Sequence, residues 1–579
     1  MIKIIKNFFY LINPKYSYKI FFLLFLIFIL AIFEVLSIGA IIPFIYSILS
    51  DQNFFLLNFL KNNFNFHGNN LIKFFLILIF IVFLIKNIIV IFFVYFQSSL
   101  SSNIRKDLSE RLYKSYLNIN FKTFLKKNSS EFIKNINVEC ENFRYTLFIT
   151  ILSFSEIIIF FFITGFLLIY NPLFSIFLFI LVSLFFYIYV LFFKKILKEK
   201  GISRFRNLES LFKIVIETLT SLKEIRVLGI EKNFLKKYNN SNYKYTNDVI
   251  SNEFYLNLPK VLVELAGVIV IVFIIFINID NKFSSTQLIA SLGVYGLASF
   301  RILPCLNRIL LGYNHLKLAT QTVTRLLESV KQLQYQHDVA DSYLELNKKI
   351  LNINSINIVN LSFSYGDKDK FLIDNINFKI NKNSFTGIIG QSGSGKSTLL
   401  NIIVGLLKPD KGAVYFNKNL DIYDNLKYFH KKIAYVSQDI NIIDDSIKNN
   451  IAFGVEENFI DNNKLLKAVD DAKLKNFINE LDKGLETKLG ERGARLSGGQ
   501  KQRLGIARAL YFNPELIVFD ESTSALDLNT EKDIISTIYE FKGHKTIIFA
   551  THKTSLLDNC DSVIEILENK LKVIQSYKS

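Results

Sequence analysis

The stretch Gly390–Ser397 reads GQSGSGKS and lies between a short apolar run, Gly387–Ile389, and a segment with helical character. A glycine-rich turn between a strand and a helix lets backbone N–H groups point at phosphate oxygens. Lys396 would supply a point charge for the β- and γ-phosphates, and the Ser397 hydroxyl would bind Mg²⁺. The loop residues expected to contact the nucleotide are Gly390, Ser392, Gly393, Gly395, Lys396, Ser397 and Thr398. Alone, this pattern predicts only nucleotide binding.

Two further motifs follow the loop in a fixed order. Leu496–Gln500 reads LSGGQ, and Leu516–Glu521 reads LIVFDE. With GQSGSGKS ahead of them, they resemble the ATP-binding cassette, an α/β P-loop domain. The resemblance implies that the chain is an ATP hydrolase whose cofactors are ATP and Mg²⁺.

The first part of the chain is strongly apolar, and 51% of all 579 residues are hydrophobic. A membrane helix needs about 20 apolar residues. Six runs are long enough: Ile20–Ile42, Leu71–Phe96, Leu147–Ile169, Leu173–Phe193, Val261–Ile279 and Leu288–Leu311. The alternative, buried helices of a large soluble protein, fits poorly because several runs are essentially uncharged. The first run is too long for a cleavable signal peptide. An α-helical membrane domain of six spans is therefore expected.

Basic residues predict the orientation of these spans. The segments Ser98–Arg144 and Lys194–Glu253 are rich in Lys and Arg, whereas the turn Asn171–Pro172 and the loop Asp280–Ser285 are nearly uncharged. The long basic segments, both termini and the ATP site should therefore be cytoplasmic. These segments also explain much of the net charge of +18, so no nucleic-acid partner is expected.

Three regions follow from these patterns: a transmembrane domain at 1–316, a polar helix-prone linker at 317–349, and a cassette domain at 350–579. The two long inner segments should turn at Asn118–Lys127 and Leu222–Glu231. The layout resembles a half-transporter of the bacterial type IV ABC exporters. In such exporters short coupling helices at these turns sit in a groove on the nucleotide-binding domain; ordinary solvated hairpins are the alternative. The resemblance implies a multi-pass protein of the bacterial inner membrane.

Five residues outside the loop match positions with roles in the cassette family. Tyr365 would lie against adenine, and Gln438 would reach Mg²⁺ and the attacking water. Asp520 ends an apolar strand, from which its carboxylate could hold Mg²⁺. Glu521 is the candidate general base, and His552 matches the histidine that contacts the γ-phosphate. The alternatives are a strand-edge tyrosine in a hydrophobic pocket for Tyr365, a surface glutamine for Gln438 and a packed core histidine for His552.

The LSGGQ motif has a separate role. Ser497 and the amides of Gly498 and Gly499 lie near an expected helix N-terminus, which favours anions. The resemblance implies that these residues and Gln500 face the γ-phosphate held by an opposite subunit. Because one chain then holds half of each of two sites, a dimer is expected, most simply a homodimer.

Charged residues inside membrane spans are costly and commonly mark function. Lys86, Lys260 and Arg301 lie within or at the ends of the expected spans. We interpret them as lining a cavity for a phosphate-bearing substrate. The stretches Val82–Phe93 (VFLIKNIIVIFF) and Phe300–Ile309 (FRILPCLNRI) resemble the lipid-linked oligosaccharide flippase of bacterial protein N-glycosylation (PglK-type), which implies that these cations take a pyrophosphate.

Other roles for these residues remain open. Lys260 could extend to the cytoplasmic surface, and Lys86 could pair with a neighbouring acid, since Glu34, Glu156 and Glu264 also lie in the spans. The segment Ser50–Asn70 could form an external interfacial helix that engages a lipid tail, or a structural lid. The leading hypothesis is ATP-driven flipping of a polyprenyl-pyrophosphate oligosaccharide or similar anionic glycolipid from the inner to the outer leaflet. The alternative is export of a peptide or hydrophobic small molecule.

Overall fold

The computed structural model describes most of the chain in two compact units. The described residues are 2–48, 69–127, 129–280, 285–341, 352–366, 371–417, 419–490, 493–521, 528–554, 557–567 and 570–576. The first unit comprises Met1–Leu117 and Ser129–Gln334, and the second comprises Asn118–Asn128 and Tyr335–Ser579. The expected interfacial helix, Ser50–Asn70, lies outside the described residues except for Asn69 and Asn70, which begin the next helix. The expected domain boundary at Ile350 also lies outside them.

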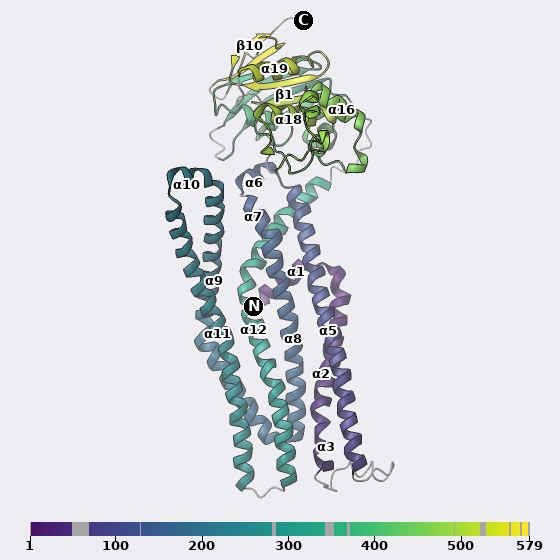
Figure 1. Ribbon diagram of the computed structural model, residues 1–579, viewed down its shortest axis with the longest axis vertical. Coiled ribbons are helices and arrows are strands. Elements are labelled where there is room, and N and C mark those ends of the chain that lie inside the picture. The colour runs from purple at the N-terminus through teal and green to yellow at the C-terminus, as the bar shows by residue number, and fades with distance from the viewer. Residues whose placement is uncertain are drawn as a thin grey trace. The chain divides into compact units, whose positions relative to one another are not determined.

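The first unit is built from helices (Figure 1). Their bounds are α1 Ile2–Leu11, α2 Ser17–Gly39, α3 Ile41–Ile48, α5 Asn69–Leu117, α7 Ser129–Lys134, α8 Cys140–Tyr170, α9 Pro172–Thr220, α10 Leu222–Leu228, α11 Glu231–Asp280 and α12 Ser285–Asp341. A 3₁₀ turn at Pro14–Tyr16 precedes α2, and a π-helical turn at Asn135–Glu139 precedes α8.

Several of these helices are much longer than a bilayer is thick. Helices α5 and α9 have 49 residues each, α11 has 50 and α12 has 57. At about 1.5 Å per residue, each exceeds the roughly 30 Å hydrocarbon core by a wide margin. Among the described residues, four helical segments are long and apolar enough to cross a membrane: Pro14–Ile48, Asn69–Leu117, Glu131–Tyr170 and Ser291–Leu316. The expected fourth and fifth spans fall within α9 and α11, where many side chains lie outside the description.

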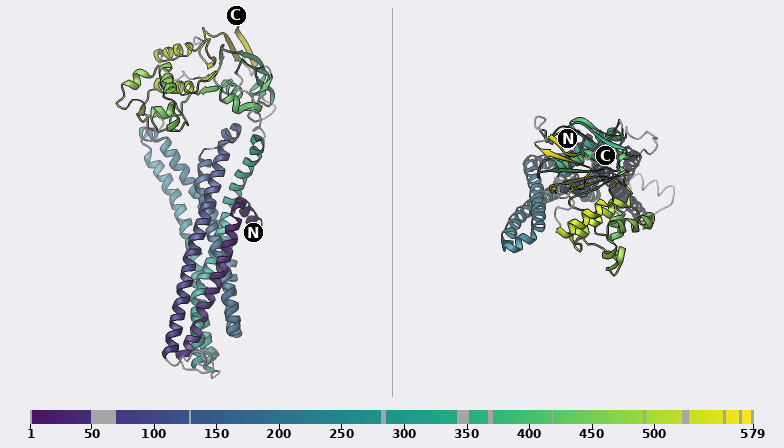
Figure 2. Two further views of the ribbon diagram at one scale, coloured as in Figure 1. Left: turned by 90° about the vertical axis from the view of Figure 1, so that its right-hand side faces the viewer. Right: turned by 90° about the horizontal axis from the view of Figure 1, so that it is seen from above.

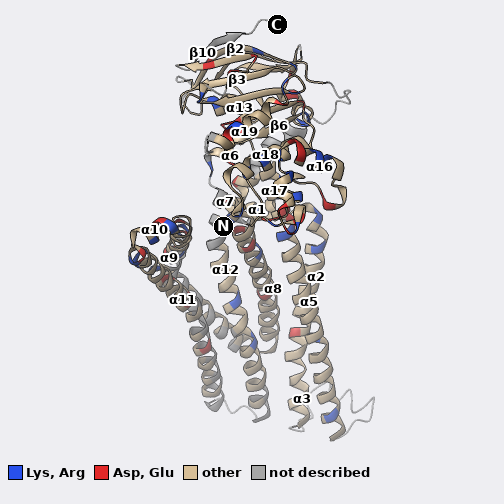
Figure 3. Cartoon of the chain, turned by 45° about the horizontal axis from the view of Figure 1, so that its top comes forward, with Lys and Arg blue, Asp and Glu red and all other residues tan. Residues whose placement is uncertain are grey.

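Helices α9 and α11 run side by side and are joined by α10 (Figures 1 and 2). Helix α10 ends at Gly229, whose φ of 64° is the left-handed conformation that commonly terminates helices. Charged residues gather at this end of the hairpin (Figure 3), including Lys223, Glu224 and Arg226. The expected turn at Leu222–Glu231 therefore lies at the polar tip of a long helical hairpin.

The second unit contains two sheets. A four-stranded antiparallel sheet has the order β2-β1-β4-β5, and a six-stranded sheet has the order β10-β9-β3-β8-β7-β6. The larger sheet is parallel except at β10. The strands are β1 Ser355–Phe363, β2 Ile373–Asn381, β3 Phe385–Gly390, β4 Lys411–Phe416, β5 Leu420–Asp421, β6 Ile433–Val436, β7 Leu516–Asp520, β8 Thr546–Thr551, β9 Ser562–Leu567 and β10 Lys570–Ser576.

Helices cover this parallel sheet, and its central strands are continuously buried. All residues of β3, β7 and β8 are buried, as expected for parallel strands covered on both faces. The helices are α13 Lys396–Ile403, α14 Leu426–His430, α15 Ile447–Ile451, α16 Asn462–Asp471, α17 Lys475–Asn479, α18 Gly498–Tyr511 and α19 Leu528–Tyr539. The unit is thus an α/β domain, as the glycine-rich loop predicts.

The short helix α6 (Phe121–Lys126) belongs to this second unit although its sequence interrupts the first. The Asn120 side chain caps its first turn by accepting a hydrogen bond from the backbone N–H of Lys122, at 2.9 Å. The ring of Phe121 packs against the hydrophobic core of the second unit. Lys122 donates to the Ser364 carbonyl at 2.9 Å and lies 4.9 Å from the Phe363 ring centre. The segment expected to be a coupling helix is therefore packed on the α/β domain.

Candidate nucleotide site and membrane charge network

The order of the parallel sheet brings the predicted catalytic segments to one edge. The glycine-rich loop follows β3, and Gln438 lies two residues after β6. Glu521 follows β7 directly, and His552 follows β8 directly. Strands β3, β8, β7 and β6 are consecutive neighbours in the sheet. Their carboxyl ends form one edge, which is where open α/β sheets bind ligands.

Backbone geometry explains the glycines of the loop. Gly393 and Gly395 have φ values of 82° and 98°, which side-chain-bearing residues rarely adopt. At Gly390, an added Cβ would lie 2.5 Å from the Ser394 hydroxyl and 3.1 Å from the Ile566 carbonyl oxygen. The Ser394 hydroxyl is itself buried and has no hydrogen-bond partner among the described residues. The loop is therefore tightly wound and retains an unused polar group, as suits a loop that wraps a polar ligand.

Lys396 is buried at the start of α13, with a side chain that is 4% exposed. Its ammonium group donates to the carbonyl oxygens of Gly390 and Gln391, at 2.9 and 3.1 Å. It also forms an ion pair of 2.9 Å with the Glu521 carboxylate. The predicted phosphate-binding lysine and the predicted general base are thus in direct contact.

Glu521 has an unusual backbone conformation. Its φ is 45°, in a region that few residues other than glycine adopt. A hydrogen bond of 3.0 Å from its N–H to the Ala550 carbonyl fixes this turn at the end of β7. Strained backbone of this kind is concentrated at functional sites.

Asp520 lies at the buried end of β7 and is held by two hydroxyl groups. The Ser397 hydroxyl donates to one carboxylate oxygen at 3.0 Å, and the Tyr435 hydroxyl donates to the other at 2.7 Å. Burial raises the pKa of Asp520, while these two hydrogen bonds oppose the rise. Burial, together with the nearby carboxylate, raises the pKa of Tyr435. Ser397 and Asp520 are two of the three residues predicted to bind Mg²⁺, the third being Gln438, and the structure places these two in contact.

Tyr435 is a residue that sequence reasoning missed. It lies within β6, three residues before Gln438, where it reads as an ordinary apolar strand residue. Its contact with Asp520 crosses between β6 and β7, so only the pairing of these strands reveals it.

The LSGGQ segment begins α18 with a complete capping box. The Ser497 hydroxyl accepts from the N–H of Gln500 at 3.2 Å, and the Gln500 side-chain oxygen accepts from the N–H of Ser497 at 2.8 Å. At Gly499 an added Cβ would lie 2.5 Å from the Thr530 side chain. Ser497 and Gly498 are exposed. An exposed helix N-terminus is thus presented at the position predicted to bind an anion.

The remaining predicted residues have different surroundings. Gln438 is exposed, and its carbonyl oxygen accepts from the Gln502 side chain of α18 at 2.9 Å. The Tyr365 hydroxyl lies 3.2 Å from that of Thr398, which ties the predicted adenine-stacking ring to the start of α13. His552 is exposed. The next residue, Lys553, pairs with Glu531 of α19 at 2.8 Å.

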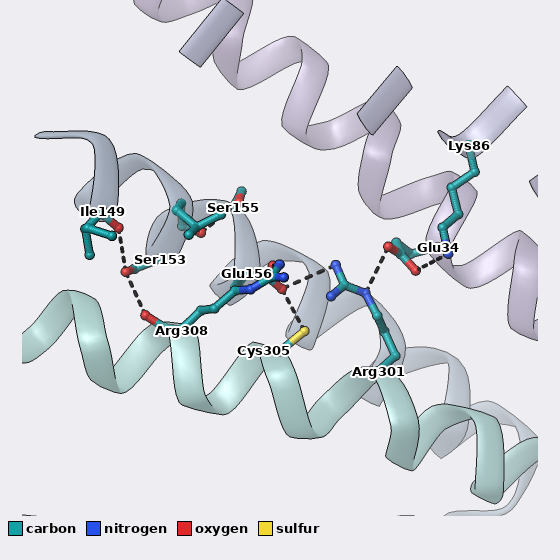
Figure 4. Close-up of polar contacts among 10 residues, drawn as sticks. Glu34, Lys86, Ile149, Ser153, Ser155, Glu156, Arg301, Cys305 and Arg308 are labelled. Carbon is teal, nitrogen blue, oxygen red and sulfur yellow. Dashed lines mark hydrogen bonds and ion pairs between the residues drawn. The ribbon is translucent and has the colours of Figure 1, made fainter. Parts of the chain in front are cut away.

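In the first unit, two of the three predicted substrate-cavity cations form ion pairs (Figure 4). Lys86 of α5 lies 3.1 Å from the Glu34 carboxylate of α2, and Arg301 of α12 lies 2.9 Å from it. Arg301 also contacts Glu156 of α8 at 3.3 Å, and Arg308 contacts Glu156 at 2.5 Å. We refer to Glu34, Lys86, Glu156, Arg301 and Arg308 as the membrane charge network.

Lys86 thus pairs with a neighbouring acid, Glu34, as one of the two interpretations of this residue predicted. The third predicted cation, Lys260, lies in α11, and its side chain is outside the described residues. The Cys305 thiol also donates to Glu156, at 2.8 Å. Sequence analysis noted the acids and the bases in the spans, but the pairing depends on how α2, α5, α8 and α12 pack.

Comparisons with known proteins agree with a helical membrane region followed by an α/β nucleotide-binding domain. Residues 17–296 match the family model for the ABC transporter transmembrane region, and residues 373–524 match that for the ABC transporter. Together the two matches cover well over half of the chain. The chain belongs to the ABC transporter family. It has the half-transporter arrangement of exporters in this family, one membrane region followed by one ATP-binding domain.

Several relatives are named ATP-dependent lipid A-core flippase. The one from Pasteurella multocida is 36% identical over 214 residues, which are 37% of this chain and 36% of that protein. The one from Idiomarina loihiensis is 27% identical over 374 residues, 63% of either chain. The alignments thus span less than two thirds of these relatives' length. A solved structure, a bacterial Atm1-family ABC exporter with ATP bound, has the same fold, with a TM-score of 0.70 at 20% identity over 96% of this chain and 95% of that one.

Proposed function

We propose that this ABC transporter, as a homodimer, hydrolyses ATP to move an anionic lipid-linked oligosaccharide or similar glycolipid from the inner to the outer leaflet. In this proposal it lies in the bacterial inner membrane, with both termini and the ATP-binding domain cytoplasmic. The observation that carries the substrate class is the membrane charge network. Its three cationic side chains face two carboxylates, which leaves one positive charge in excess. A charge at that depth is costly unless it serves a ligand or a partner.

The nucleotide chemistry is assigned to residues at the sheet edge. Lys396 would meet the β- and γ-phosphates, and the amides of Gly393 and Gly395 would line the same loop. The adjacent oxygens of Ser397 and Asp520 suit Mg²⁺, a hard cation that prefers oxygen ligands, and Gln438 would complete that set. When bound, Mg²⁺ would neutralise phosphate charge during the transfer.

Glu521 acts as the general base in this scheme, and its ion pair with Lys396 would determine when it can act. While its carboxylate contacts the Lys396 ammonium, Glu521 is not free to contact an attacking water. A phosphate that engages Lys396 competes for the same ammonium and releases Glu521. Glu521 would then take a proton from the attacking water, and His552 would orient that water and contact the γ-phosphate. Nucleotide binding would thus activate the base.

The second half of each site would come from a partner chain. Ser497, Gly498, Gly499 and Gln500 would present the exposed N-terminus of α18 to the γ-phosphate of the other protomer. Ser497 and Gly498 are exposed on the surface of one chain, so this helix N-terminus is accessible to such a partner. A lipid-facing first unit and a glycolipid substrate also agree with the names of the flippase relatives.

The test is the ATPase rate of the purified protein in lipid nanodiscs, with and without a polyprenyl-pyrophosphate oligosaccharide. We expect marked stimulation, its loss in Lys86→Glu and Arg301→Glu, and no turnover in Glu521→Gln. A normal basal rate with no response to the glycolipid would contradict the substrate assignment. A screen for stimulation by peptides and hydrophobic small molecules would then test the alternative export function.

A further inference from the structure

The carboxylates of the membrane charge network are almost completely buried. The side chains of Glu34 and Glu156 are 4% and 2% exposed, and those of Lys86 and Arg301 are 14% and 20% exposed. Apolar residues of α2, α8 and α12 surround this part of the bundle, among them Leu30, Ile159 and Ile302. In such surroundings the attraction between opposite charges is strong, and an unpaired charge is expensive.

Glu34 and Glu156 differ in how much they depend on Arg301. Glu156 also receives Arg308 and the Cys305 thiol, so it would stay paired if Arg301 moved away. The ion-pair partners of Glu34 within the described part of the chain are Lys86 and Arg301. Figure 4 shows the Glu34 carboxylate lying between these two side chains. Glu34 is therefore the acid that pairs with both cations. It would lose both of these ion pairs if Lys86 and Arg301 bound another anion.

The two cations that would receive the negatively charged group of a substrate are already occupied by Glu34. An arriving anion must replace this carboxylate and also lie close to it, where like charges repel. We propose that Glu34 is an internal counter-ion that competes with the anionic lipid for Lys86 and Arg301, and so sets the affinity and the charge selectivity of the membrane site. This inference rests on the proposed function.

Competition of this kind has a measurable consequence. When an internal competitor occupies the site, only a fraction of the protein molecules can bind the ligand. The apparent dissociation constant equals the intrinsic one divided by that fraction. Removing the charge of Glu34 therefore tightens the binding of anions, although it removes two ion pairs from the protein. A residue with a purely structural role would show the opposite pattern, since its loss would weaken both the fold and the site.

The experiment compares wild-type protein, Glu34→Gln and Glu264→Gln in nanodiscs of neutral lipid. Glu264 is the matched control because it is an exposed glutamate of α11 outside the network. The probe is geranylgeranyl pyrophosphate, and geranylgeraniol is the uncharged comparison. The readouts are the probe concentration that gives half-maximal ATPase stimulation and the rise in melting temperature on probe binding.

We expect Glu34→Gln to lower the half-maximal concentration of the pyrophosphate by about tenfold. Its melting temperature without probe should fall, and the rise caused by the probe should exceed that of the wild type. Glu264→Gln should match the wild type, and geranylgeraniol should distinguish none of the proteins. If Glu34→Gln does not fold, Glu34→Asp shortens the side chain while keeping its charge, and a smaller shift in the same direction is expected.

Two results would overturn the inference, and they differ in what they say about function. Unchanged or weaker pyrophosphate binding in Glu34→Gln, beside clear binding by the wild type, would reject the counter-ion role and leave the anionic substrate standing. A failure of all three proteins to respond to the pyrophosphate would reject both.

Discussion

Each unit of the chain contains a lysine, fully buried in the cassette and partly buried among the membrane helices, that is paired with a glutamate, and the two pairs are instructive to compare. Lys396 lies 2.9 Å from Glu521 in the cassette, and Lys86 lies 3.1 Å from Glu34 among the membrane helices. In both, the carboxylate occupies a cation that we assign to a phosphate group. The pair in the cassette lies among backbone carbonyls at the edge of a sheet, whereas the pair in the membrane helices is joined by a second cation, Arg301.

The difference lies in what each glutamate does once it is displaced. Glu521 is the candidate general base, so its release by a phosphate would start the chemistry. Glu34 has no candidate reaction, so its displacement would only oppose binding. The same ion pair would thus act as a switch in one place and as a selectivity filter in the other.

The largest effect is expected when the general base of the cassette pair, Glu521, is replaced. Glu521→Gln keeps the size of the side chain but removes its ability to accept a proton, so ATP hydrolysis should fall by about a thousandfold. Phosphate release measures the loss, and nucleotide binding should persist. Glu540→Gln, at an exposed position of the same domain, should hydrolyse ATP normally. Substantial turnover by Glu521→Gln would assign the base elsewhere.

The pair in the membrane helices can be tested by replacing Arg301, the cation that contacts both Glu34 and Glu156. Arg301→Met leaves Glu34 with one partner and removes another from Glu156, so the free energy of unfolding should fall by about 3 kcal/mol. Arg308→Met removes a side chain that is 43% exposed and should cost about 1 kcal/mol. Thermal denaturation in nanodiscs would rank the two. Equal losses would show that burial does not govern the strength of these pairs.

The Mg²⁺ site allows a finer test, through Tyr435. Its hydroxyl orients the Asp520 carboxylate, and loss of such outer contacts weakens metal binding by about tenfold. Tyr435→Phe should therefore raise the Mg²⁺ concentration needed for half-maximal ATPase activity. Tyr423→Phe is the control, because the Tyr423 hydroxyl donates to backbone carbonyls of Ile402 and Leu407 instead. An unaltered Mg²⁺ requirement in Tyr435→Phe would contradict this role.

The smallest expected effect concerns α6. Lys122→Ala removes one hydrogen bond to Ser364 and a contact with the Phe363 ring, which together should be worth about 1 kcal/mol. If α6 transmits ATP-driven movement, the glycolipid should stimulate the ATPase activity of Lys122→Ala less than that of the wild type, while the basal ATPase rate of the variant persists. Leu125→Ala, at an exposed position of the same helix, should behave as the wild type. Equal losses in both variants would argue against a specific role for Lys122.

The two pairs also show what the sequence could predict. The glycine-rich loop, its strand and its helix follow from local spacing, because Gly393 and Gly395 need positive φ and Lys396 opens the helix. The order of the sheet then explains why Glu521 reaches Lys396 from a distant strand. Sequence reasoning singles out all these residues as site candidates, but it does not predict that two of them touch.

The membrane charge network was harder to predict. Lys86, Arg301, Glu34 and Glu156 were recognised as charges within apolar spans, but no local pattern says which acid faces which base. That depends on the rotation and packing of separate helices. Tyr435 escaped notice for a related reason, since its partner Asp520 lies 85 residues away in the next strand.

The central claim, ATP-driven movement of an anionic glycolipid, is tested most directly by measuring translocation. A fluorescent polyprenyl-pyrophosphate oligosaccharide would be placed in proteoliposomes, and its loss from the cassette-facing leaflet would be followed after ATP addition. We predict that the wild type depletes the lipid from that leaflet, and that Glu521→Gln and Arg301→Glu do not. Depletion at the same rate without ATP, or none by a wild-type protein that hydrolyses ATP, would contradict the account.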